Sequence, residues 1–127
     1  MTDGINPKDR FGLQKLSISK VPSTALATCA GAMMLGAEKY GPYNWREKDV
    51  RATVYVDAAL RHLYAWFEGE EVDPESGVSH LGHVMACAAI LIDAQHMGGP
   101  ADDRPEHVYL QVRELMQTLA DDVLRKE

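Results

Sequence analysis

The sequence predicts an all-α protein, a four-helix bundle preceded by an extended N-terminal arm. Apolar residues recur at helical spacing in four stretches, Gly and Pro pairs separate these stretches, and no stretch alternates apolar with polar residues. With 127 residues, 46% hydrophobic and 25% charged, the composition is that of one globular domain. We therefore expect residues 1–20 to form the arm and residues 21–127 to form a single helical domain.

The first predicted helix follows an arm of little periodicity. It begins at Pro22 and Ser23 and ends near Lys39, before the Gly41-Pro42 pair. Its expected buried stripe consists of Ala27, Gly31, Met34 and Glu38. This spacing places a carboxylate at the edge of a buried face.

The second predicted helix runs from about Val50 to Glu68 and is stopped by Gly69. One of its faces carries Tyr55, Ala59, His62 and Trp66. The other carries Asp57, Arg61, Tyr64 and Glu68. We expect the first face to be buried and the second to meet solvent.

The third predicted helix starts with Asp73 as its N-cap and Pro74 in its first turn, and it reaches about Met97 before Gly98-Gly99-Pro100. Its apolar stripe is Val78, Leu81, Met85, Ala88 and Ile92. The neighbouring stripe is Ser76, His80, His83 and Cys87. Small residues over 86–89 would let another helix approach closely.

The fourth predicted helix spans about Glu106 to Arg125. The residues expected to face inward are Val108, Leu115, Leu119 and Val123. Four helices with short joints favour a bundle. Because so short a chain buries only about two thirds of its unfolded surface, we expect a homo-oligomer.

Charge and hydropathy restrict the class of partner. The net charge of −6 disfavours binding to a nucleic acid polymer. The longest apolar run, Val84 to Ile92, is too short to span a bilayer, and the N-terminus lacks a hydrophobic signal segment. With Cys29 and Cys87 expected to be free core thiols, a cytoplasmic protein without a membrane partner is predicted.

Two clusters on the predicted third helix could carry chemistry. His80 and His83 lie one turn apart, a spacing that can bind a metal or a phosphate, although two hydrogen-bonded structural histidines also fit it. Asp73, Glu75 and Ser76 precede them. These three either cap the helix or help complete a Mg²⁺ site.

The loop from Lys39 to Arg46 combines two cations, three aromatic residues and the amide of Asn44. Such a set can stack a base and bind phosphate, or it can close the end of the bundle as an aromatic plug. From spacing alone, Asp57 and Arg61 form a surface ion pair and His62 is a core histidine.

Several blocks of sequence, in order, resemble those of the phage and bacterial dATP/dGTP diphosphohydrolases. The blocks are Gly36-Ala37-Glu38-Lys39-Tyr40-Gly41, Asn44-Trp45-Arg46, Asp57-Ala58-Ala59-Leu60-Arg61-His62, Asp73-Pro74-Glu75-Ser76-Gly77 and His80-Leu81-Gly82-His83. The resemblance covers roughly residues 16–94 and leaves out the fourth helix. This family resembles the wider MazG-like all-α nucleotide pyrophosphohydrolases, which are four-helix modules assembled as dimers or tetramers.

The resemblance implies an enzyme that converts a purine nucleoside triphosphate, such as dGTP, dATP or GTP, to the monophosphate and pyrophosphate, in phage nucleotide-pool remodelling. It implies Mg²⁺ or Mn²⁺ as cofactor, with the metal ligands drawn from Glu38, Asp57, Asp73, Glu75, His80 and His83. The expected catalytic residues are Glu38, Asp57 and Glu75. The expected substrate contacts are Lys39, Asn44, Trp45, Arg46, Arg61, His80 and His83.

One departure from the MazG-like pattern keeps alternatives open. The Glu-x-x-Glu of residues 68–71 and the Glu-x-x-Asp of residues 70–73 overlap in a joint, instead of lying on two helices. His80-x-x-His83 stands where such a motif is expected. A protein that binds or sequesters nucleotide without hydrolysing it, or a purely structural helical assembly protein, therefore also fits the sequence.

Overall fold

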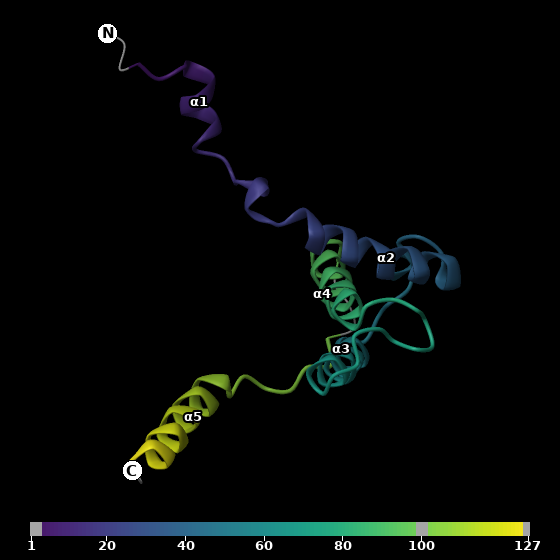
Figure 1. Cartoon of the computed structure of the whole chain (residues 1–127), viewed down its shortest axis with the longest axis vertical. Coiled ribbons are helices and arrows are strands. Elements are labelled where there is room, and N and C mark those ends of the chain that lie inside the picture. The colour runs from purple at the N-terminus through teal and green to yellow at the C-terminus, as the bar shows by residue number, and fades with distance from the viewer. Residues whose placement is uncertain (1–3, 99–101, 126–127) are drawn as a thin grey trace.

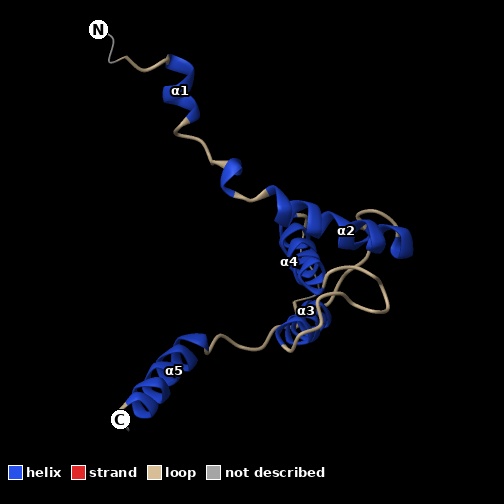
Figure 2. Ribbon diagram, viewed as in Figure 1, coloured by secondary structure: helices blue, strands red, loops and turns tan. Residues whose placement is uncertain are grey.

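The computed structural model describes residues 4–98 and 102–125, so the ends of the predicted arm and domain lie outside it. Its α-helices are α1 (Pro7–Gly12), α2 (Ser23–Tyr40), α3 (Ala52–Phe67), α4 (His80–His96) and α5 (Tyr109–Leu124). Two 3-10 turns, η1 (Ile18–Lys20) and η2 (Asn44–Arg46), complete the regular structure. The all-α class is confirmed, because the described residues contain no strand beyond an isolated bridge between Val72 and Ser79 (Figure 2).

Helix α4 is the centre of the fold. It packs against α3 along one side and against α2 along another, and η2 also contacts it. The segment carrying α1 and the segment carrying α5 both project away from this three-helix unit (Figure 1). The candidate functional residues of the chain therefore lie on α2, α3, α4 and the loops that join them.

Helices α2 and α4 approach each other closely at Gly82. A Cβ atom added there would lie 2.7 Å from the carbonyl oxygen of Thr28 and 3.2 Å from its methyl carbon. Ala86, one turn further along α4, is also buried. The close approach of α2 thus lies at Gly82, outside the small residues 86–89 for which it was predicted.

The prediction that the third helix begins at Asp73 is wrong. Residues 68–79 form a loop, and α4 begins at His80. Inside the loop the backbone N–H of Asp73 donates to the carbonyl of Val78, and the N–H of Gly77 donates to that of Asp73. Gly77 has a φ of 74°, which a helix does not allow. Asp-Pro starts turns as well as helices, and Gly77 closes a turn here. At the other end of the predicted helix, Gly99 and Pro100 of the stop signal lie outside the described residues.

The expected buried stripe of α2 is also wrong within this chain. Its four members are exposed, Met34 to 68%, whereas Ala32 is the buried residue of the helix. The reason is that α2 is apolar on more than one side, so spacing alone does not select a face. On α4, Ala88 and Ile92 of the expected stripe are likewise exposed, while His80 and three small residues are buried.

Helix α3 orients its faces as predicted. Tyr55, Ala59, His62 and Trp66 are all partly buried, and Asp57, Arg61, Tyr64 and Glu68 are all exposed. Its N-terminus is held by the connector to α5, because Asp103 accepts hydrogen bonds from the backbone N–H and the hydroxyl of Thr53.

The prediction that four apolar residues of the last helix region face inward is wrong, since each is more than half exposed. These residues are Val108, Leu115, Leu119 and Val123. Helix α5 lies apart from the other helices, so its apolar face has no partner within the described chain (Figure 1). None of the described helices is both long and apolar enough to cross a membrane.

Candidate active site

The loop after α2 is fastened to α4 through Asp93. Arg46 donates two hydrogen bonds to this carboxylate, each of 2.8 Å, and the indole N–H of Trp45 donates a third of 2.7 Å. The guanidinium of Arg46 also stacks over the ring of Tyr43 at 4.5 Å. The bonds from Arg46 and Trp45 lower the pKa of Asp93 to about 2. We call this arrangement of Trp45, Arg46 and Asp93 the loop latch.

An apolar cavity of about 410 Å³ lies between α2, α3, α4 and the latched loop. Most of its wall is hydrocarbon or aromatic, and Asn44 adds an amide. Its larger lining residues include Met33, Leu35, Trp45, Val54, Tyr55 and Ile90. Cavities of this size and character accommodate small organic molecules, including ring systems.

A polar cavity of about 500 Å³ adjoins the apolar one. Its lining residues are Lys39, Tyr40, Arg61, His62, Asp73, Glu75, Ser76, His80 and His83. Four of these, Lys39, Tyr40, His62 and His83, also line the apolar cavity. The two cavities therefore meet at shared walls while differing sharply in polarity.

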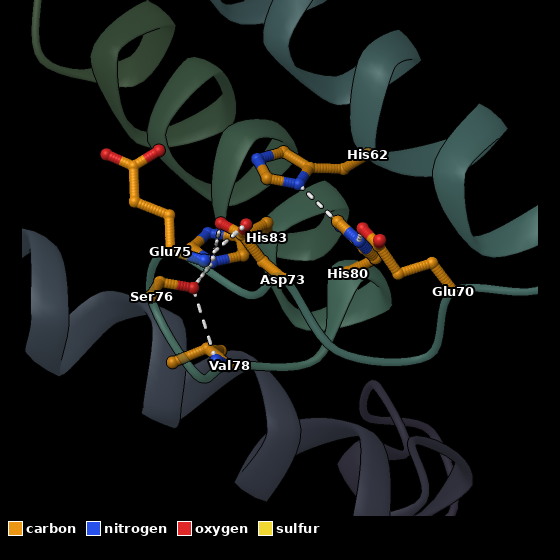
Figure 3. Close-up of polar contacts among 8 residues, drawn as sticks. All are labelled: His62, Glu70, Asp73, Glu75, Ser76, Val78, His80 and His83. Atoms are coloured by element: carbon orange, nitrogen blue, oxygen red, sulfur yellow. Dashed lines mark hydrogen bonds and ion pairs between the residues drawn. The ribbon is translucent and has the colours of Figure 1, made fainter.

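Three histidines in the wall of the polar cavity form what we call the histidine cluster, His62, His80 and His83 (Figure 3). The Nδ1 atoms of His62 and His80 lie 2.9 Å apart, and Nε2 of His80 lies 2.6 Å from a carboxylate oxygen of Glu70. The rings of His62 and His83 are stacked, with centroids 4.3 Å apart. His80 is 4% exposed, so its two polar partners satisfy a buried ring.

The loop from Asp73 to Val78 brings two oxygen-bearing side chains to this cluster. Asp73 accepts the backbone N–H of Glu75 at 3.1 Å, and its carboxylate lies 3.8 Å from Nε2 of His83. The hydroxyl of Ser76 accepts the N–H of Val78 at 3.2 Å and lies 2.8 Å from the same Nε2 of His83. Backbone bonds thus hold both oxygens against the ring.

The electrostatics favour neutral rings beside an ionised carboxylate. Burial lowers the pKa of His62, and the neighbouring His83 and His80 lower it further. Burial is also the main cause that lowers the pKa of His83. For Asp73, burial acts to raise the pKa, but hydrogen bonds from Glu75 and Ser76 outweigh it and lower the pKa. At neutral pH His62 and His83 offer imidazole lone pairs, and Asp73 offers an anionic oxygen.

The structure brings most of the sequence-predicted site residues to the two cavities. Those in the polar cavity are Lys39, Arg61, Asp73, Glu75, His80 and His83. Asn44 and Trp45 line the apolar cavity. Glu38, Asp57 and Arg46 line neither of the two, and Arg46 is bonded to Asp93.

Sequence reasoning gave no site role to His62 or Glu70. His62 follows Arg61 on α3 and lies on the half-buried face, so its position beside a polar cavity depends on how α3 meets α4. Glu70 lies in the joint after α3, where no helical spacing relates it to His80. The available sequence signal was a Glu in the joint between two histidine-bearing helices.

Comparison with protein families identifies the group to which the chain belongs. The model of the dATP/dGTP diphosphohydrolase N-terminal family matches residues 5–104. This range holds all the residues that line the two cavities and excludes α5. Neither a curated protein nor a solved structure matches the chain. The family's name indicates a hydrolase of dATP or dGTP, and because the match spans most of the sequence, this chain belongs to the dATP/dGTP diphosphohydrolase family.

Proposed function

We propose that this chain hydrolyses a purine deoxynucleoside triphosphate, dATP or dGTP, to the monophosphate and pyrophosphate. The observation that carries the proposal is the meeting of an apolar and a polar cavity at four shared residues. A nucleotide has the same division, with a flat aromatic base at one end and a chain of anionic phosphates at the other. The base would occupy the apolar cavity and the phosphates the polar one.

The lining of the apolar cavity suits a purine in its chemistry. Trp45 and Tyr55 offer aromatic faces for stacking, and the loop latch holds Trp45 in place through its indole N–H. The amide of Asn44 can both donate and accept, as the polar edge of a base requires. The base is therefore held by stacking and identified by hydrogen bonds.

The charges of the polar cavity favour a metal-dependent reaction. Lys39 and Arg61 are its two permanent cations, and Asp73 and Glu75 are its two carboxylates. These four charges cancel one another, so they do not neutralise a triphosphate. A divalent cation such as Mg²⁺ or Mn²⁺ would supply that charge and would polarise the attacking water.

The reaction requires one bond to form and one to break. Water attacks a phosphorus, the P–O bond between the α and β phosphates breaks, and pyrophosphate leaves. Lys39 and Arg61 are proposed to hold the phosphate oxygens, and the exposed Glu75 to accept a proton from water. Glu38 and Asp57 lie outside both cavities, and alanine variants of each test whether they take part as ligands.

We also propose that the chain works as a homo-oligomer. It exposes 10602 Å² of surface, whereas a compact monomer of 14.1 kDa exposes about 6,700 Å². The excess of roughly 3,900 Å² is more than one partner buries in a standard interface, about 800 Å². The exposed apolar faces of α2 and α5 supply suitable surface, and a second copy is the occupant that would cover both.

The test is to measure pyrophosphate release separately from orthophosphate release, with each of the eight common nucleoside triphosphates and with Mg²⁺ or Mn²⁺. We expect purine-selective pyrophosphate release that EDTA abolishes. Lys39→Met should weaken turnover, whereas Lys20→Met, which replaces an exposed lysine outside both cavities, should leave it unchanged. Nucleotide binding without turnover would support a sequestering protein instead, and absence of binding would leave a helical assembly protein.

A further inference from the structure

We propose that His62, Asp73 and His83 together bind a divalent transition-metal ion of the borderline class, such as Co²⁺ or Zn²⁺. One ligand atom from each residue is available, and these atoms all lie within 4.8 Å of one another. Two imidazoles and one carboxylate suit such ions better than Mg²⁺, which prefers oxygen ligands. This site deepens the proposed function, because it lies in the wall of the polar cavity.

The three ligands come from three separate elements. His62 lies on α3, Asp73 in the following loop and His83 on α4, so the ion would bind where these elements converge (Figure 3). Ligands held at about 2.1 Å by a tetrahedral ion lie about 3.4 Å apart. The Asp73 oxygen and the His83 Nε2 are already 3.8 Å apart, and a shared ion would draw in all three ligand atoms and turn the stacked rings of His62 and His83 toward it.

The hydrogen bonds of the histidine cluster can leave one ring nitrogen of His62 free to bind a cation. The carboxylate of Glu70 can only accept, so Nε2 of His80 carries the hydrogen of their 2.6 Å bond. Where that hydrogen is the only one on the His80 ring, Nδ1 of His80 is the acceptor and Nδ1 of His62 donates across the 2.9 Å separation. This leaves Nε2 of His62 without a hydrogen and able to bind a cation, as outer partners do for metal-binding histidines.

Ser76 plays the corresponding part for His83. Its hydroxyl is the hydrogen-bond neighbour of Nε2 of His83, at 2.8 Å, and it also bonds to the Asp73 carboxylate. When an ion takes the lone pair of His83, the hydroxyl can turn its hydrogen to Asp73 without losing a partner. Three protein ligands leave further positions on the ion open for water or a phosphate oxygen.

The experiment is a titration of the EDTA-stripped full chain with Co²⁺ in the absence of nucleotide, followed by the visible absorption of bound Co²⁺ and by calorimetry. We expect saturable binding of one ion per chain that an excess of Mg²⁺ does not displace. His62→Ala, Asp73→Asn and His83→Ala should each abolish it. Glu70→Gln should weaken it by at least about tenfold, because Glu70 sets the hydrogen positions without touching the ion.

The matched control is His96→Ala, since His96 is an exposed histidine at the end of α4 that lines neither cavity. An equal loss of binding in this control would overturn the proposal. A wild-type chain with no saturable Co²⁺ site would also overturn it, and that result does not depend on whether the variants fold. Turnover is scored separately. Hydrolysis of dGTP with Mg²⁺ but no Co²⁺ binding would support the proposed function and refute this metal site. Co²⁺ binding without turnover would support the metal site and count against the proposed function.

Discussion

Replacing Gly82 with alanine should destabilise the protein, although the same change in most helices is stabilising. Alanine in a helix interior is favoured over glycine by about 1 kcal/mol. Here the added Cβ would lie 2.7 Å from a backbone carbonyl oxygen of α2, which no side-chain rotation can move aside. Forcing a methyl group into a packed contact costs about 1–3 kcal/mol, and a fixed backbone neighbour favours the upper part of that range. We therefore expect a net loss of about 1–2 kcal/mol.

The assay is urea unfolding followed by far-UV circular dichroism, at one protein concentration because assembly would make stability depend on it. Gly36→Ala is the matched control, since a Cβ on this α2 glycine meets nothing within 4 Å. It should gain about 1 kcal/mol from helix propensity alone. If Gly82→Ala gained as much as Gly36→Ala, the close crossing of α2 and α4 would be refuted.

The remaining predictions concern the loop latch, the polar cavity and the assembly. Asp93 has a pKa lowered from 3.8 to about 2, so its contribution to stability is fully present above pH 4 and is lost as the pH falls through about 2. The indole N–H resonance of Trp45 should shift over that interval, and an Asp93→Asn variant should show no such shift. Arg61→Gln should raise the KM for nucleotide at least about tenfold, the effect of losing a hydrogen bond to a charged group. Arg104→Gln, outside both cavities, should not change the KM, and equal effects would count against the phosphate role of Arg61. Leu119→Glu on the exposed face of α5 should yield a smaller species in sedimentation velocity, and an unchanged species would remove α5 from the interface.

The bounds of a helix could be predicted well where the residues at its ends are compatible with only one local structure. Helix α2 ends at Tyr40, before Gly41, within one residue of the prediction, and α3 lies within two residues of its predicted bounds. The start of α4 was misplaced because Asp73-Pro74 fits both a helix N-cap and a turn. The left-handed Gly77 and the bridge between Val72 and Ser79 decide for the turn.

The candidate site was only partly predictable. His80, His83 and Asp73 lie near one another in the sequence, and short-range spacing could relate them. His62 lies on another helix, and its part in the cluster depends on the packing of α3 against α4. Arg46 was predicted to contact phosphate, but its guanidinium is bonded to Asp93. The two residues are 47 positions apart, so no local sequence pattern indicates this pair.

The sequence by itself determined the helical class, the family and most of the chemically active residues. The reason is that local spacing, turn residues and motif order depend only on the order of residues in the chain. Only the tertiary structure decided which faces of α2 and α4 are buried and which side chains meet. The physical reason is that α2 is apolar on more than one side, so its orientation is set by the close approach of its backbone to Gly82 on α4. The same packing of helices aligns two cavities of opposite polarity and stacks His62 against His83.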